Sequence, residues 1–124
     1  MLKTFTKGAI AALTLTALTA GGAMAADNTF TVTKAADNYI TASVKAFKKG
    51  DFDRSAKFSE AAINNKISKR RQAIAQSNLC AALGEMGEFE KAGEACDTAL
   101  ELRPGYAPAT ANKNALTVRL AALK

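Results

Sequence analysis

The feature that most constrains the fold of this chain is a short motif that occurs twice, 37 residues apart. Residues 50–55 read GDFDRS and residues 87–92 read GEFEKA, so residues of the same character recur in the same order. A spacing of this size is typical of repeat proteins. Each copy lies between two segments of helical character, where the glycine closes a turn and the acids begin the next helix at the positive end of its dipole. The motif therefore predicts two hairpins of antiparallel helices.

Apolar and small residues around both motifs recur every three to four positions, as they do on the inner face of a helix. This periodicity predicts a first hairpin at about residues 36–65 and a second at about residues 73–106. Pro104 and Gly105 end the second hairpin, and a last helix follows over residues 107–124. No segment of the core requires a strand, so the expected fold class is all-α.

The first 25 residues have the features of a signal peptide. Lys3 and Lys7 make the start basic, residues 9–20 are uncharged and mostly apolar, and Ala-Met-Ala at residues 23–25 fits a cleavage site after Ala25. The uncharged run is shorter than the roughly 20 residues that span a bilayer. We therefore expect a cleaved leader, no transmembrane anchor and a bacterial periplasmic protein, with full export left open.

Cleavage would leave 99 of the 124 residues, with 15 basic residues in place of 17 and 11 acidic ones, a net charge of about +4. This is the size of one small domain, residues 36–124, preceded by residues 26–35. In that leading segment Phe30 and Val32 alternate with threonines, a pattern that indicates an extended arm.

Counted from Ala73, the second hairpin has large residues, a turn glycine, an aromatic residue, two small residues and a closing proline at Leu79, Leu83, Gly87, Phe89, Ala92, Ala99 and Pro104. This pattern resembles the tetratricopeptide repeat, a helical hairpin of about 34 residues. The first hairpin matches it at Tyr39, Gly50, Phe52, Ser55 and Ala62. Gln76, Cys80 and Cys96 depart from the family pattern. The resemblance implies a right-handed solenoid fragment of two hairpins with a C-terminal capping helix.

The resemblance also implies a ligand groove on the concave face, formed by the first helix of each hairpin. Position by position, the candidate groove residues are Ile40, Val44, Phe47, Lys48, Ile74, Ser77, Asn78, Ala81 and Glu85. Family members that clamp a terminal carboxylate use lysine, arginine and asparagine, and only Asn78 has a counterpart here. The groove therefore suits an amphipathic or extended segment of a partner. The alternative, that the first helix only covers the core, stays open.

Cys80 and Cys96 are the only cysteines, and two readings of them stay open. An oxidising compartment favours a disulfide. The family geometry places Cys80 closest to Ala92, however, and a Cα separation above about 7 Å would leave two buried thiols. Their spacing differs from the C-x-x-C of redox proteins.

The composition argues against catalysis. The chain has no histidine, and no activating base can be named beside a serine or cysteine. We therefore expect no enzymatic activity, no cofactor and no metal.

A basic cluster precedes the second hairpin, at Lys66, Lys69, Arg70 and Arg71. We read it as a solvated connector, because no aromatic residues alternate with it as in nucleic-acid sites. We therefore expect no nucleic-acid partner.

The expected function is that of a non-enzymatic periplasmic adaptor that binds a segment of another protein in its groove. The alternative is a structural or stress-related envelope protein that associates with anionic surfaces through the basic cluster. Because repeat arrays usually need about three units for stability, self-association is also open.

Overall fold

The computed structural model describes residues 28–124, which contain five α-helices and no strand. The helices are α2 (Asn38–Lys48), α3 (Phe52–Asn64), α4 (Lys69–Glu85), α5 (Phe89–Leu102) and α6 (Ala107–Ala122). The expected all-α class is confirmed. The expected signal peptide and its cleavage site lie outside the described residues.

The two motif glycines close the turns that the sequence predicts. Gly50 follows α2 with φ +80° and Gly87 follows α4 with φ +81°, a conformation that residues with a Cβ rarely adopt. After Gly50 the carboxylate of Asp51 accepts a hydrogen bond from the backbone N–H of Arg54 and begins α3. In the first copy the motif thus ends one helix and caps the next, whereas Glu88 of the second copy stands at the start of α5 without a side-chain cap hydrogen bond.

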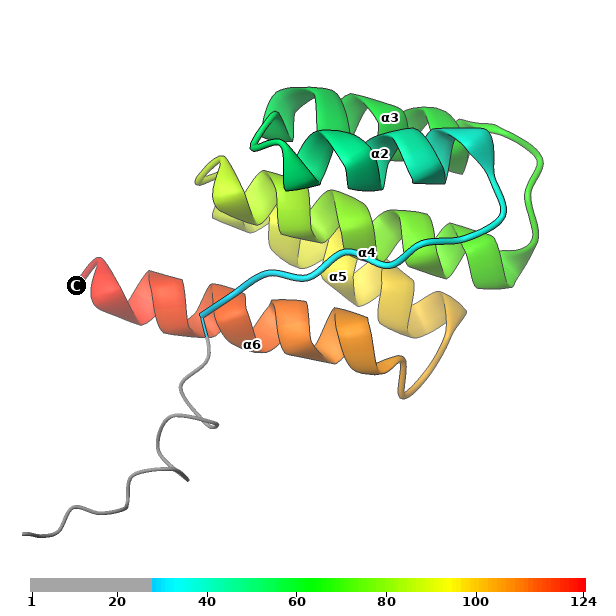
Figure 1. Cartoon of the computed structure of the whole chain (residues 1–124). Helices are drawn as coiled ribbons and strands as arrows, with labels where there is room; N and C mark the ends of the chain where they lie inside the picture. The colour runs from blue at the N-terminus through cyan, green and yellow to red at the C-terminus, as the bar shows by residue number, and fades with distance from the viewer. Residues whose placement is uncertain (1–27) are drawn as a thin grey trace, which may run out of the picture.

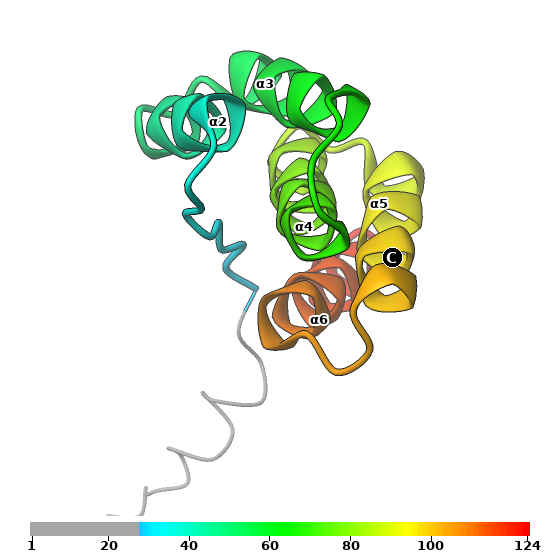
Figure 2. The same cartoon turned by 90° about the vertical axis from the view of Figure 1, so that its right-hand side faces the viewer.

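Successive helices lie side by side along an arc (Figures 1 and 2). α4 is the central element, since it contacts each of the other four helices, and 11 of its 17 residues are buried. In Figure 2 the segment before α2 runs down to α6 along the side of α4 that faces away from α5. The helices therefore leave one face of α4 to be covered by that segment.

Small residues form most of the helix interfaces. Between α2 and α3, Ser43 and Ser59 are fully buried and their hydroxyl oxygens lie 2.6 Å apart. Ser55 donates its hydroxyl to the backbone oxygen of Ser43 at 2.9 Å. These buried hydroxyls satisfy one another, which lets α2 and α3 approach closely without bulky side chains.

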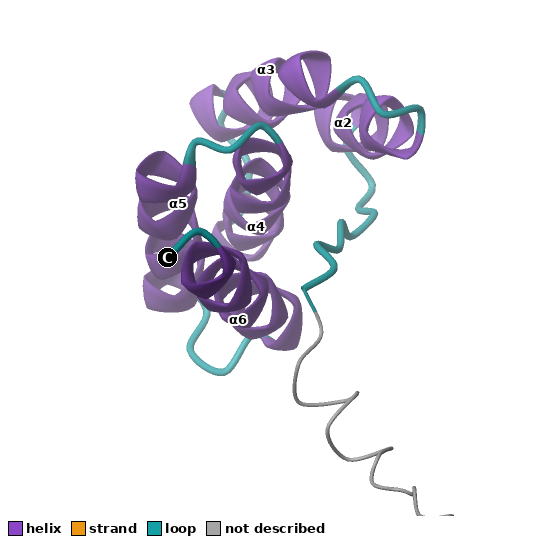
Figure 3. Ribbon diagram, turned by 90° about the vertical axis from the view of Figure 1, so that its left-hand side faces the viewer, coloured by secondary structure: helices purple, strands orange, loops and turns teal. Residues whose placement is uncertain are grey.

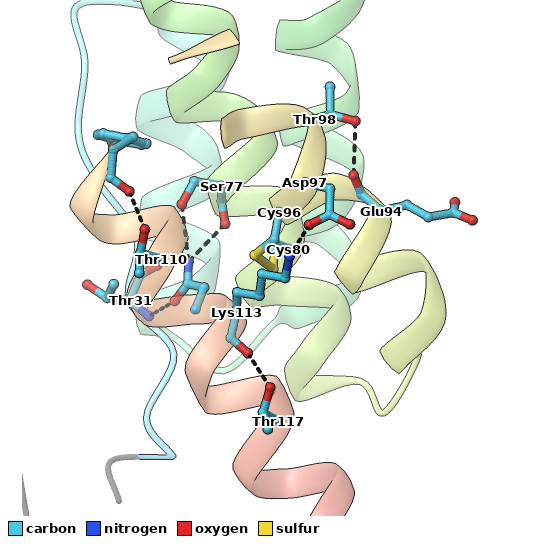
Figure 4. Close-up of a disulfide and its surroundings, with 12 residues drawn as sticks. Thr31, Ser77, Cys80, Glu94, Cys96, Asp97, Thr98, Thr110, Lys113 and Thr117 are labelled. Carbon is cyan, nitrogen blue, oxygen red and sulfur yellow. Dashed lines mark hydrogen bonds and ion pairs between the residues drawn. A yellow bond between two sulfur atoms is a disulfide. The ribbon is translucent and has the colours of Figure 1, made fainter. Parts of the chain in front are cut away.

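A disulfide joins α4 to α5 between Cys80 and Cys96 (Figure 4). Their Cα atoms are 5.3 Å apart, within the range that a disulfide spans without movement of the backbone. Of the two readings left open by the sequence, the disulfide is the one present. At the next residue of α5, Asp97 pairs with Lys113 of α6 at 2.6 Å.

The start of α4 differs from the expectation. We expected the basic cluster to form a connector, but Ser68 accepts a hydrogen bond from the N–H of Arg71 and starts the helix at Lys69. Three of the four basic residues thus stand in the first turn of α4. Each cation in the first turn costs about 0.3–1 kcal/mol at an exposed site, and the helix begins here with the Ser68 cap in spite of that charge.

Candidate functional site

The candidate site is the face of α4 and α6 that the N-terminal arm covers. The arm, residues 28–35, has neither helical nor strand structure. It passes α4 and reaches α6, as seen from opposite sides in Figures 2 and 3. We call the surface beneath it the arm-binding face.

Two asparagines hold the backbone of the arm. The side-chain oxygen of Asn78 in α4 accepts from the N–H of Thr33 at 2.8 Å, and its amide donates to the oxygen of Thr33 at 2.9 Å. Asn112 in α6 binds Thr31 in the same way, at 2.8 and 3.0 Å. Both asparagines are fully buried. Each side-chain amide thus pairs with both the backbone N–H and the backbone C=O of one residue. The two residues held in this way are two positions apart, so both lie on the same edge of the extended chain.

A third residue orients Asn112. Its amide also donates to the backbone oxygen of Ser77 at 3.1 Å and to the Ser77 hydroxyl at 3.2 Å. Figure 4 draws these two bonds as dashed lines that end at the labelled Ser77. The amide is therefore held from α4 in the orientation that the arm needs. Contacts to backbone alone select an extended conformation and leave the side chains of the bound segment free to vary.

A pocket for one aromatic side chain adjoins Asn112. Phe30 is only 4% exposed, and its ring tip lies where a Cβ on Gly84 would stand, 2.3 Å from Cζ. The guanidinium of Arg119 lies over the ring, 4.6 Å from its centre. Arg119 is fixed by Glu85, at 2.7 Å, and donates to the backbone oxygen of Asn28 at 3.1 Å. A glycine floor and a clamped cation therefore define a slot for a flat ring.

The second inward side chain of the arm is aliphatic. Val32 is half-buried and packs against two clusters of buried residues, one that contains Phe30 and Leu116 and one that contains Ile40 and Ile74. Because side chains two apart in an extended chain point the same way, Phe30 and Val32 share the face toward the helices. The arm thus presents an aromatic residue and, two positions later, an aliphatic residue to the arm-binding face.

The nine residues expected to line a groove differ in their burial and contacts. Glu85 pairs with Arg119 beside the arm, Phe47 is half-buried with its ring 5.1 Å from that of Phe52, and Lys48 is exposed. The other six are buried: Ile40, Val44, Ile74, Ser77, Asn78 and Ala81. Of these, Ser77 and Asn78 take part in holding the arm.

Three contributors to the site were not anticipated from the sequence: Gly84, Asn112 and Arg119. The sequence could have indicated Asn112, since this residue stands between Ala109 and Ala115 on the buried side of α6. A polar residue within an apolar stripe needs a hydrogen-bond partner. Reading α6 only as a cap overlooked that requirement.

The end of the arm near α2 lies in basic surroundings. Lys34 lines a depression of about 470 Å³ with Arg70 and Arg71, and a second one of about 310 Å³ with Lys45 and Lys48. No carboxylate lines either depression. Among residues 28–124, none of these five cations takes part in an ion pair. We call the five residues the basic rim.

The predicted basic cluster is therefore divided. Arg70 and Arg71 belong to the basic rim, whereas Lys66 and Lys69 are exposed and line neither depression. A larger depression, of about 500 Å³, lies over α3, α4 and α5. Carboxylates and lysines alternate around it, so it has no single charge to select a ligand.

Residues 28–124 contain no group of three or more histidine, cysteine, aspartate or glutamate side chains placed to hold a metal ion. Within the same range, no helix has both the length and the apolar character that crossing a membrane requires.

Comparison with known proteins found no matching family model, no similar curated protein and no similar solved structure.

Proposed function

We propose that this protein is a non-enzymatic interaction module of the periplasm, built of tetratricopeptide-like hairpins, whose arm-binding face holds an extended segment of a partner protein. The observation that carries the proposal is the pair of buried asparagines. Asn78 and Asn112 each take the N–H and the C=O of one residue in an extended chain. The two residues that they bind are two positions apart, so the amides hold one edge of the main chain, as a neighbouring strand does when a peptide adds to a sheet edge.

The occupancy of this face by the arm supports the proposal. Because the arm is covalently attached, it competes for the face at an effective concentration of about millimolar. A partner segment can displace the arm if its better contacts give it a higher affinity for the face. The core of the helices does not depend on the arm for most of its contacts, because α4 packs against all four other helices. Release of the arm would therefore open the face while the helices stay packed.

The proposal is tested by photo-crosslinking in cells. A photoreactive residue is placed at Lys48, exposed beside the arm-binding face, and in a second strain at Glu101, exposed on α5. We expect one recurrent protein to crosslink from position 48 and not from position 101. The crosslink should be lost with Asn112→Ala and kept with Asn114→Ala, an exposed asparagine of the same helix. Equal crosslinking from both positions, or no protein at all, would contradict the proposal.

A second candidate is a structural or stress-related envelope protein that associates with an anionic surface. The basic rim favours it, because five cations face solvent without a carboxylate partner. Such attachment would weaken steeply with salt. It would also be lost with Arg70→Ala combined with Arg71→Ala, and it would be unaffected by Asn112→Ala.

A further inference from the structure

We propose that the natural occupant of the arm-binding face is an extended segment with an aromatic residue, an aliphatic residue two positions later and an acidic residue two positions after that. The protein's own arm is a weaker, tethered version of this ligand. This inference rests on the proposed function and adds the chemistry of the partner and the competition that regulates its access.

The first position is set by the Phe30 pocket. Its floor is Gly84, where any side chain would overlap the ring, and its outer wall is the guanidinium of Arg119. A flat aromatic ring fills this slot and gains the cation–π contact. An aliphatic side chain would forfeit that contact, so the slot selects for an aromatic residue.

The register of the following residues is set by the asparagines. Counting Phe30 as position 0, Asn112 binds the backbone at +1 and Asn78 binds it at +3. The side chains at 0 and +2 then share the face toward the helices, and the side chain at +4 follows on the same side of the arm, where it is exposed. Position +2 is Val32, which is half-buried against the core.

Position +4 is where the arm is a poor match. It is occupied by Lys34, which lines both depressions with the other four members of the basic rim. A cation beside four others is disfavoured, whereas an aspartate or glutamate there would lie beside opposite charges. Reversing this charge should tighten binding about tenfold at low salt, as for a few partly exposed charge pairs acting together.

The same charge argument decides between occupants. A second copy of this chain would bring its own lysine to position +4 and would gain nothing over the tethered arm. An anionic surface would satisfy the basic rim but would leave the aromatic slot and the two asparagines unused. A separate acidic segment uses all three features.

The test measures binding of three synthetic peptides to the mature chain carrying Phe30→Ala, which weakens the arm as a competitor. The peptides are ADNTFTVTKA, which repeats residues 26–35, the same peptide with Lys34→Glu, and the Lys34→Glu peptide with Phe30→Ala. Fluorescence anisotropy is recorded at about 0.01 M and about 1 M ionic strength, where the Debye length is about 30 Å and about 3 Å.

We expect the glutamate peptide to bind about tenfold more tightly than the lysine peptide at low salt, with the difference shrinking at high salt. The peptide without the aromatic ring should not bind measurably. Asn112→Ala should abolish binding and Asn114→Ala should not. The chain with its native Phe30 should bind each peptide more weakly, because its own arm competes.

Equal affinity for the lysine and glutamate peptides at low salt would overturn the acidic position. If no peptide binds to a folded Phe30→Ala chain, the proposal that the arm and a separate segment compete for the face is wrong. Growth in particle size with concentration, reversed by the peptide, would assign the face to a second copy and equally overturn the proposal. If a partner crosslinks in cells and the crosslink depends on Asn112, but the lysine and glutamate peptides bind equally, the proposed function stands and the acidic position is wrong.

A second variant keeps the test valid where Phe30→Ala impairs folding. In the otherwise unchanged chain, Lys34→Glu makes the arm a better ligand. We expect a higher thermal midpoint and weaker binding of the glutamate peptide. Lys124→Glu changes the net charge equally at the exposed C-terminal residue and serves as the control. A lower midpoint for Lys34→Glu than for the control would overturn the proposal.

Discussion

Replacing Gly84 with alanine should detach the arm and leave the helices in place. The new Cβ would stand 2.3 Å from Cζ of Phe30 and 2.7 and 2.8 Å from its two Cε atoms. The ring would have to retreat by about 1 Å or more to reach ordinary contact. Arg119 covers the ring and Asn112 fixes the next residue of the arm, so the retreat breaks contacts on both sides. We therefore expect the ring to leave its slot.

The magnitude follows from what the arm loses. Exposing the Phe30 side chain costs about 1.5–3 kcal/mol, and losing its contact with Arg119 costs about 0.5–1 kcal/mol. A total near 3 kcal/mol lowers the docking equilibrium of the arm by about a hundredfold. The helix itself gains about 1 kcal/mol, because alanine replaces glycine in its interior.

The assay is amide hydrogen exchange measured by NMR. We expect the backbone amides of Thr31 and Thr33 to lose protection by up to about a hundredfold in Gly84→Ala, while amides in α4 keep theirs. Gly93→Ala is the matched control, because Gly93 also stands within a helix and a Cβ there meets nothing within 4 Å. That control should raise the thermal midpoint by several degrees, with the arm unchanged. Unchanged protection of both threonines in Gly84→Ala would refute the reasoning.

Three further outcomes are expected. Reduction of the bond between Cys80 and Cys96 should lower stability by about 3 kcal/mol and the thermal midpoint by at least about 10 °C, and an unchanged midpoint in scanning fluorimetry with reductant would contradict this. Ser59→Ala should cost about 1–2 kcal/mol in urea unfolding, because it removes the shortest hydrogen bond of the buried Ser43 hydroxyl, and a gain in stability would count against that bond. Arg119→Leu should weaken arm docking by roughly tenfold in hydrogen exchange, and unaltered protection of the arm would show that the ring is held by shape alone.

Local sequence features anticipate much of this architecture. The glycines of the repeated motif mark both turns, because a positive φ depends on the residue type at a single position. The alternation of Phe30 and Val32 indicates an extended segment for the same kind of local reason. Neither observation depends on knowing what lies nearby in the folded chain.

The arm-binding face needed information that no local pattern contains. Asn112 binds a residue 81 positions earlier, and that contact exists only because the arm turns back along α4. The start of α4 shows a smaller limitation, since a run of basic residues suggested a connector, whereas Ser68 caps a helix that begins within that run. For the cysteines, helical offsets left two readings open, and the 5.3 Å separation of their Cα atoms depends on how closely α4 and α5 approach.

The 81-residue separation between Thr31 and Asn112 has a consequence for synthesis. The arm leaves the ribosome long before α6, and until α6 has formed it lacks Asn112 and Arg119. We expect a nascent or C-terminally truncated chain to display its aromatic arm in solvent. Closure of the arm would then be among the last events of maturation and would distinguish a finished molecule from an unfinished one for any chaperone or protease that recognises exposed aromatic segments.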